Sequence, residues 1–322
     1  MNQHPSHGTL TTREQNNELM ARAAHQHFVL GLTQSDVAKR LGITKFKAHR
    51  LIATARERGL VRIQIDIPTS SRLELERRLS LETGLETVVI TPSDHSDAMP
   101  LSQVVGQSAA SFVSEIISDN MTVAVSWGVT LRALSTSIEP AEHNNLSIVP
   151  MIGSLSRRSS LDRFDASTVL AQKLGAECYY LPGPLICDSH ETKTAINAQP
   201  ILQQALELAR NADLALVSIG GHDFSSLDHA GVLSQEQIDS ARAAGAIGNY
   251  LGQFIDRDGE LIDHEINRLG IGVSLAESLN IKNRIMIAGG PAKVAALKAI
   301  IGKGMITGLI TDEDTATCLL DT

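Results

Sequence analysis

Apolar residues recur at helical spacing through the first sixty residues of the chain. They predict three helices: one over residues 18–30, a second that begins at Thr33 and a third that begins at Thr44. Both threonines are good N-cap residues, and Asp36 stands three residues after the first of them, in the capping-box position. A glycine separates each helix from the next, and strict alternation over residues 61–67 then predicts a strand. This order is the layout of a helix-turn-helix with the strand as its wing.

After a charged, leucine-containing helix over residues 69–83, the pattern changes to short apolar runs separated by Ala- and Leu-rich helical stretches. The runs cover residues 87–91, 122–126, 147–151, 178–181, 214–219, 284–288 and 305–310. Strands that are apolar at nearly every position are typical of sheets buried on both faces. The alternation of such strands with helices predicts a largely parallel sheet covered by helices. Asp258 and Gly259, between apolar flanks, predict a hairpin turn.

The distribution of charge along the chain bears on whether the protein binds nucleic acid. Of the 322 residues 43% are hydrophobic, enough for a core, while the net charge of −8 alone argues against nucleic acid. However, residues 1–80 carry 13 basic and 7 acidic side chains, whereas residues 81–322 carry 15 and 29. A basic N-terminal part on an acidic body is typical of a DNA-binding module joined to a regulatory domain.

Several classes of site are not indicated by the sequence. Cys178, Cys187 and Cys318 have no paired or CxxC spacing, so neither a disulfide framework nor a metal site is predicted. We find no phosphate loop, dinucleotide fingerprint or nucleophile elbow, and we predict no catalytic residue and no cofactor. The chain has no apolar run long enough to span a membrane and no signal-peptide core. A cytoplasmic protein without membrane association is expected.

The third helix carries the side chains expected to contact DNA. Its N-terminal residues would lie in the major groove, where Arg and Lys bind guanine or phosphate, and the start of the second helix would contact phosphates. The alternative is that these cations merely solvate a helix face. The fit of the whole segment to one layout, together with the charge reversal, favours DNA binding. The candidate DNA-binding residues are Thr33, Gln34, Thr44, Lys45, Lys47, His49, Arg50 and, on the wing strand, Arg62.

Four of the predicted strands end in loops of small and polar residues. Ligands of open α/β sheets bind beyond the carboxyl ends of the strands, where glycine lets the backbone approach a ligand. Any one glycine has the alternative explanation of a simple turn, but four such loops together favour a cleft for a polar ligand. The candidate effector-binding residues are Ser126, Gly128 and Thr130; Gly153, Arg157 and Arg158; Gly220 and Gly221; and Gly289, Gly290 and Lys293.

Motifs in both halves of the chain resemble one family. LTQSDVA (32–38), LGIT (41–44), HRL (49–51) and GLVRI (59–63) resemble the N-terminal domain of the SorC family of sugar-responsive bacterial transcriptional regulators. LPGPL (181–185) resembles a recurrent Leu-Pro-Ala-Pro-Leu of that family, and ADLALVSIG (212–220) resembles its Ala-Asp strand that ends in Gly. AGGPAK (288–293) and ITDEDTA (310–316) resemble its closing signatures. The resemblance covers roughly residue 18 to the end. It implies a Rossmann-like effector domain related to sugar-phosphate isomerases, with a sugar, polyol or sugar phosphate as effector and Lys293 as one of its contacts.

Some positions depart from the pattern of this family. The recognition helix begins with Thr44 and Lys45 where the family commonly has Ser-Arg, and His49 replaces a Ser. Asn249 stands where the family usually carries Asp or Glu, so a hydroxyl acceptor remains but a useful base is lost. Asp165 replaces a frequent Asn, which disfavours a phosphate nearby. We therefore add Asn249 to the effector-binding candidates and expect a neutral polyol or sugar ahead of a sugar phosphate.

The expected architecture is α/β, with a winged helix-turn-helix followed by a Rossmann-like, sugar-isomerase-like effector domain. The expected segments are a disordered leader (1–17), the DNA-binding domain (18–68), a linker helix (69–83) and the effector domain (84–322). The expected function is transcriptional regulation of a carbohydrate or polyol catabolic operon by a homodimer or homotetramer on double-stranded operator DNA. The alternative is a sugar-phosphate isomerase-like enzyme with an appended helix-turn-helix.

Overall fold

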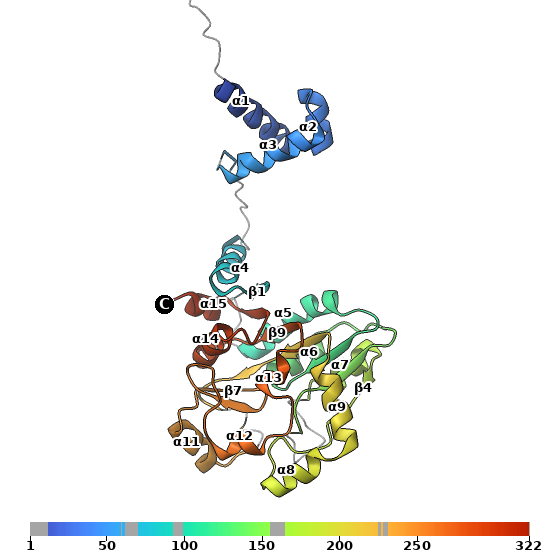
Figure 1. Cartoon of the computed structure of the whole chain (residues 1–322), viewed down its shortest axis with the longest axis vertical. Coiled ribbons are helices and arrows are strands. Elements are labelled where there is room, and N and C mark those ends of the chain that lie inside the picture. The colour runs from blue at the N-terminus through green and yellow to red at the C-terminus, as the bar shows by residue number, and fades with distance from the viewer. Residues whose placement is uncertain are drawn as a thin grey trace, which may run out of the picture. The chain divides into compact units, whose positions relative to one another are not determined.

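The computed structural model describes residues 12–58, 60–61, 70–92, 99–154, 165–224, 227 and 231–321. Contacts between residues divide the chain into two compact units, Met1–Pro68 and Thr69–Thr322. The first unit is helical in its described part, and the second is a mixed α/β unit (Figure 1). Among the described helices, none combines the length and the apolar character needed to cross a membrane.

Unit 1 is built on four helical segments, in which α3 contacts both α1 and α2. The segments are α1 (Thr12–Ala24), the π-helical turn η1 (His25–Val29), α2 (Gln34–Leu41) and α3 (Lys45–Glu57). Their buried inner faces are small or branched, with Ala23, Val37, Ala48 and Ile52 each at most 5% exposed. The helix-turn-helix predicted from the sequence is therefore confirmed.

The caps of α2 and α3 explain where these helices begin and end. The Thr33 hydroxyl accepts the N–H of Asp36 at 3.2 Å, and the Thr44 hydroxyl accepts the N–H of Lys47 at 3.2 Å. Gly42 ends α2 in a left-handed conformation with φ 65°, which glycine adopts without strain. The sharp turn between the two helices thus follows directly from Thr and Gly at these positions.

The predicted leader over residues 1–17 is too long, because α1 already begins at Thr12. The residues from 12 to 17 lack apolar periodicity, but Arg13, Glu14 and Gln15 are good helix formers. The predicted wing strand over 61–67, with Arg62, lies outside the described residues from position 62 onward.

A seven-stranded parallel sheet forms the centre of unit 2, in the order β1-β10-β9-β5-β2-β3-β4. The strands are β1 (Thr87–Thr91), β2 (Thr122–Val125), β3 (Ser147–Pro150), β4 (Glu177–Cys178), β5 (Leu214–Val217), β9 (Asn283–Ile287) and β10 (Gly308–Asp312). Each of the seven apolar runs overlaps one of these strands, so the prediction of a parallel sheet is confirmed. The predicted and observed strand ends differ most at β4 and β10. β4 is only two residues long, and β10 begins three residues after the start of the predicted run.

Helices cover both faces of this sheet, as the continuous apolar runs predict. Alternate residues along a strand enter different cores: Val123 and Val125 of β2 pack in one cluster, and Ala124 packs in the other. Helices α5 (Leu101–Ile116), α6 (Val129–Ser137) and α7 (Ser167–Leu174) contribute to the first cluster. The second receives side chains from α4 (Ser70–Thr83), α9 (Pro200–Arg210), α14 (Val294–Gly302) and α15 (Glu313–Leu320).

A second, antiparallel sheet of three strands was not expected from the sequence. The apolar run over 214–219 does not form one strand, because the chain leaves the parallel sheet after Val217. It then enters β6 (Ile219–Gly220), which pairs with β7 (Gly248–Tyr250), and β7 pairs with β8 (Gln253–Ile255). The expected hairpin turn follows β8, where Ile255 and Leu261 form an antiparallel bridge and Gly259 has φ 75°. The remaining helical segments are α8 (His190–Asn197), α11 (Gln235–Ala243), α12 (Glu265–Leu269), α13 (Leu275–Ser278) and η3 (Pro291–Lys293).

Candidate functional site

A cavity of about 130 Å³ lies at the carboxyl ends of β2, β5 and β9, three neighbouring strands of the parallel sheet. It is formed by the loops that follow these strands, together with β7. Six of the twelve predicted effector-binding residues line it: Gly220, Gly221, Asn249, Gly289, Gly290 and Lys293. The structure therefore brings together residues that are more than seventy positions apart in the sequence, at the edge where ligands of parallel sheets bind.

Asn249 is the most unusual side chain in this cavity. It stands on β7 opposite Gly220 of β6 and is only 2% exposed. Its Oδ1 and Nδ2 atoms are both buried, and neither has a hydrogen-bond partner among the described residues. A buried polar group without a partner costs about 1–3 kcal/mol. Because the side chain lines a cavity and offers both a donor and an acceptor, it is suited to bind a hydroxyl group.

Lys293 supplies a cation to the same cavity. The residue keeps part of its accessible surface, but protein atoms densely surround its ammonium group. Burial lowers the pKa of Lys293, and the carboxylates of Asp223 and Asp312 oppose this shift. Since Asp223 also lines the cavity, the site already contains a negative charge beside the lysine.

The glycines of the site are required by the contacts between its loops. A Cβ on Gly221 would collide with the backbone carbonyl of Ala292, and a Cβ on Gly289 would collide with the carboxylate of Asp312. The His222 N–H also donates to the Ala292 carbonyl at 3.1 Å, which joins the same two loops. These glycines therefore bring the loops into contact, which is a structural role as well as a means of shaping the cavity.

Asp312 and Thr315 fix the start of the loop that carries Lys293. The Gly290 N–H donates to the Thr315 hydroxyl at 2.7 Å, and this hydroxyl donates to Asp312 Oδ2 at 2.6 Å. Asp312 Oδ1 accepts the Thr315 N–H at 2.9 Å, and the Asp312 side chain is almost completely buried. The position of the loop therefore depends on the N-cap of α15.

Four other predicted effector residues that the structure describes do not line this cavity. The Ser126 hydroxyl accepts the N–H of Ser218 at 3.1 Å, which ties the end of β2 to the end of β5. Gly128 precedes α6 with φ 133°, and Thr130 is buried within the first turn of that helix. Gly153 donates its N–H to the Ile271 carbonyl at 3.0 Å, away from the residues that line the cavity. These four residues therefore hold strand ends and loops together in the structure, and their role in effector binding stays a prediction. Arg157 and Arg158 lie outside the described residues.

Six residues that line the cavity were not predicted from the sequence: Trp127, Asp223, Phe224, Leu227, Pro291 and Ala292. The single tryptophan of the chain lies two residues after the end of β2 and directly before Gly128, which was the available signal. Phe224 is 1% exposed and packs against Phe254 with ring centroids 5.3 Å apart. An aromatic wall beside a few polar groups is typical of small-molecule sites.

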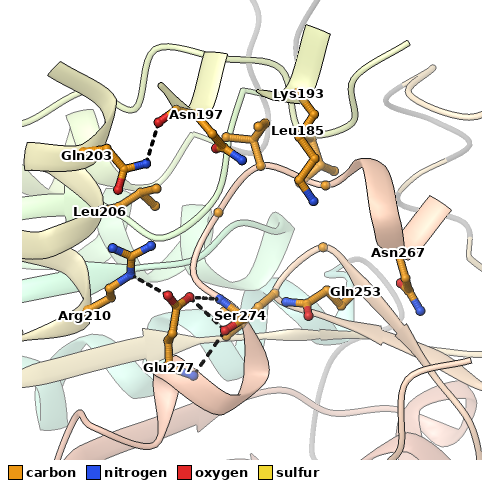
Figure 2. A pocket seen from close by; sticks show the side chains of 15 residues that line it. Leu185, Lys193, Asn197, Gln203, Leu206, Arg210, Gln253, Asn267, Ser274 and Glu277 are labelled. Carbon is orange, nitrogen blue, oxygen red and sulfur yellow. Dashed lines mark hydrogen bonds and ion pairs between the residues drawn. The ribbon is translucent and has the colours of Figure 1, made fainter. Parts of the chain in front are cut away.

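A second and larger pocket, of about 360 Å³, lies among α8, α9 and α13 (Figure 2). Its polar side chains are bonded to the protein itself: Arg210 Nε pairs with Glu277 Oε1 at 2.9 Å, and Gln203 donates to the Asn197 carbonyl at 2.7 Å. Burial raises the pKa of Glu277, but hydrogen bonds from Ser274 and the charge of Arg210 outweigh it, so the pKa lies below its ordinary value. None of the predicted effector residues that the structure describes lines this pocket, so the smaller cavity is the candidate effector site.

In unit 1 the predicted DNA-binding side chains gather at the start of α3. Lys45, Lys47, His49 and Arg50 are all exposed, while Thr44 caps the helix. Thr33 is exposed and caps α2, and Gln34 is partly buried in its first turn. Phe46, which is not among the predicted residues, is 76% exposed in the same turn as the lysines.

Within the described parts of the chain, no group of His, Cys, Asp and Glu side chains is arranged to hold a metal ion. The three cysteines are free. The candidate site is therefore built from an amide, a lysine, a carboxylate, glycine loops and aromatic rings.

Comparison with known proteins identifies relatives along nearly the whole chain. The "Sugar-bind" family model, which describes a sugar-binding domain, matches residues 68–321. The erythritol catabolism regulatory protein EryD of Brucella abortus is 32% identical over 94% of this chain and 96% of that protein. The transcriptional regulator LsrR of Klebsiella pneumoniae is 30% identical over 94% of this chain and 93% of that protein.

Solved structures show the same fold. A DeoR family transcriptional regulator from Listeria monocytogenes has a TM-score of 0.72 at 25% identity and covers 78% of this chain and 100% of its own. The full-length sorbitol operon regulator SorC from Klebsiella pneumoniae has a TM-score of 0.71 at 24% identity, covering 95% of this chain and 99% of its own.

Proposed function

Because the chain belongs to the SorC/DeoR family of sugar-binding transcriptional regulators, we propose that operator DNA binds its N-terminal unit and that a small neutral polyol or sugar controls this binding from the cavity beside Asn249. Its relatives are transcriptional regulators and not enzymes, so the isomerase alternative is dropped. Asn249 also lacks the proton-accepting carboxylate that such chemistry requires.

The observation that carries the effector site is the buried amide of Asn249 at the wall of a cavity that also contains Lys293; neither polar atom of this amide has a partner among the residues that the structure describes. A polyol or sugar offers adjacent hydroxyl groups that both donate and accept, which matches an amide and an ammonium side by side. The carboxylates of Asp223 and Asp312 already stabilise the charged form of Lys293 in part, so the counter-charge does not have to come from an anionic ligand. A cavity of about 130 Å³ favours a compact molecule, and one relative regulates the catabolism of erythritol, a four-carbon polyol.

In this proposal the DNA-binding domain extends from Thr12, where α1 begins, to residue 68, residues 69–83 are a connecting helix and residues 84–322 are the effector domain. The exposed cations at the start of α3 support placing that helix in the major groove. A homodimer or homotetramer acting in the cytoplasm agrees with this mode of binding, because paired half-sites mirror the symmetry of the protein. The oligomer has two arrangements of its paired DNA-binding domains. The effector, bound in its own domain, favours the arrangement for which the protein has the higher effector affinity.

Thermal unfolding of the purified full chain tests the effector class. Erythritol and neutral pentoses are compared with erythrose 4-phosphate and pentose phosphates, and binding of a ligand to the native state raises the unfolding temperature. We expect neutral compounds to stabilise the protein, and stabilisation by phosphorylated compounds alone would contradict the proposed class. Asn249→Leu should abolish the response, whereas Gln203→Ala, at the rim of the other pocket, should retain it.

Gel shift with an operator selected in vitro then tests control of DNA binding. The stabilising compound should change the affinity of the wild-type chain for that operator and leave the affinity of Asn249→Leu unchanged. If no stabilising compound alters binding to any selected duplex, the proposed switch is refuted.

A further inference from the structure

Phe46 is an aromatic side chain with no evident structural role in the helix that is proposed to read DNA. It is 76% exposed and does not belong to the apolar core of unit 1, which instead includes Phe28 as a packed neighbour. Its ring therefore contributes nothing to that core, and its exposure calls for another explanation.

The position of Phe46 on α3 places it at the middle of the outer face. Successive residues of a helix are about 100° apart, so Ala55, nine residues later, points in the opposite direction. Ala55 is completely buried, as is Ala48 in the inner face. His49 and Arg50 follow Phe46 by three and four residues, so they share its face, and both are exposed.

The charges around Phe46 indicate what covers it. Lys45 and Lys47 flank it in sequence, and Arg50 lies one turn further along the helix. An apolar protein surface is a poor partner for this aromatic side chain, because the cations around it would lose their hydration on contact. It suits the major groove, where phosphates border both sides and the methyl group of thymine is the apolar feature of the floor.

We infer that Phe46 reads the operator by packing its ring on the 5-methyl group of a thymine in each half-site. This inference rests on the proposed DNA binding by unit 1. It identifies Phe46 as a residue that determines specificity, in addition to the cations that supply affinity. A single exposed apolar side chain is otherwise common on protein surfaces, so the inference needs a test that addresses the methyl group itself.

The test removes the methyl group from the DNA and the ring from the protein in a double-mutant cycle. An operator is first obtained by in-vitro selection from a random duplex library with the full chain. Each thymidine is then replaced by deoxyuridine, and the affinity of wild type and of Phe46→Ala is measured by fluorescence anisotropy. Val29→Ala is the matched control, because Val29 is 68% exposed in the same unit but lies outside α3.

We expect one deoxyuridine position per half-site to weaken wild-type binding about fourfold, the effect of removing one buried methyl group. The same replacement should have no effect on Phe46→Ala, whereas Val29→Ala should behave as wild type. Since the ring is exposed, Phe46→Ala should unfold at the wild-type temperature, which separates lost recognition from lost folding.

Two results would overturn the inference. One is an equal response of wild type and Phe46→Ala to deoxyuridine at every position, and the other is selection of the same operator by Phe46→Ala with the same affinity. In either case DNA binding itself stands and only the role of Phe46 fails. If the full chain selects no duplex at all, both the proposed function and this inference fail.

Discussion

Replacement of Asn249 by leucine should make the ligand-free protein more stable. Leucine has nearly the shape of asparagine but carries no polar atoms, so the variant removes the two unpartnered groups without opening a hole. A native side chain that costs stability in the empty protein is a mark of a binding function. The prediction therefore links the stability of the apo protein to the proposed effector site.

The magnitude follows from the desolvation of the amide. A buried polar group without a partner costs about 1–3 kcal/mol, so the variant should gain about that much. For a unit the size of Thr69–Thr322, this corresponds to a rise of roughly 2–12 °C in unfolding temperature. The same change should weaken binding of the stabilising polyol by about 10- to 100-fold, because the amide contacts are lost.

Differential scanning calorimetry without and with the polyol measures both effects. Asn267→Leu is the control, because it should change the stability in the opposite direction. The Asn267 amide donates to the carbonyls of Phe254 and Ile262 and accepts the N–H of Phe254. That variant should lower the unfolding temperature. If Asn249→Leu also lowers it, the Asn249 amide has partners in the native protein and the argument for a ligand there is refuted.

Three further predictions concern other residues. Arg50→Ala should weaken operator binding about 5- to 150-fold in an anisotropy titration without changing thermal stability; unchanged affinity would remove Arg50 from the interface. Gly221→Ala should cost about 1–3 kcal/mol in urea unfolding, because its Cβ would meet a backbone carbonyl, whereas Gly302→Ala, which has open space around it, should not. The pKa of Glu277 lies below its ordinary value, so its stabilisation is present above about pH 4.5 and is lost as the pH falls. Glu277→Gln should therefore lose less stability than wild type between pH 7 and pH 3, and parallel urea profiles would contradict this.

The sequence predicts the parallel sheet well because its signal is local. Strands buried on both faces must be apolar at nearly every position, and helices between them have their own periodicity. The turn after α2 is equally local, since a threonine cap and a left-handed glycine are sufficient to specify it. The two-residue strand β6 carries no such signal, because Ile219 and Gly220 continue an apolar run without a break.

The candidate site is only partly predictable, because its geometry depends on contacts between distant loops. The rule that small residues after strands mark a cleft gave Gly220, Gly221, Gly289 and Gly290, and all four line the cavity. The same rule gave Ser126, whose hydroxyl instead accepts a backbone N–H from a neighbouring strand end. Asn249 was predicted from the resemblance to a family and not from the pattern of residues along the chain. The packing that leaves its amide without a partner among the described residues depends on the three-dimensional structure.

The pairing of β1 with β10 has a consequence for how the protein is made. β1 lies at the edge of the sheet and pairs only with β10, from Thr87 opposite Gly308 to Thr91 opposite Asp312. Contacts so distant in sequence form slowly, and β10 is synthesised roughly 10–45 s after β1 at about 5–20 residues per second. The helices of unit 1, whose contacts are local, complete their fold during that interval. Each newly made chain therefore passes through a stage in which the helix-turn-helix is finished while the sheet that carries the effector cavity is still open at its edge.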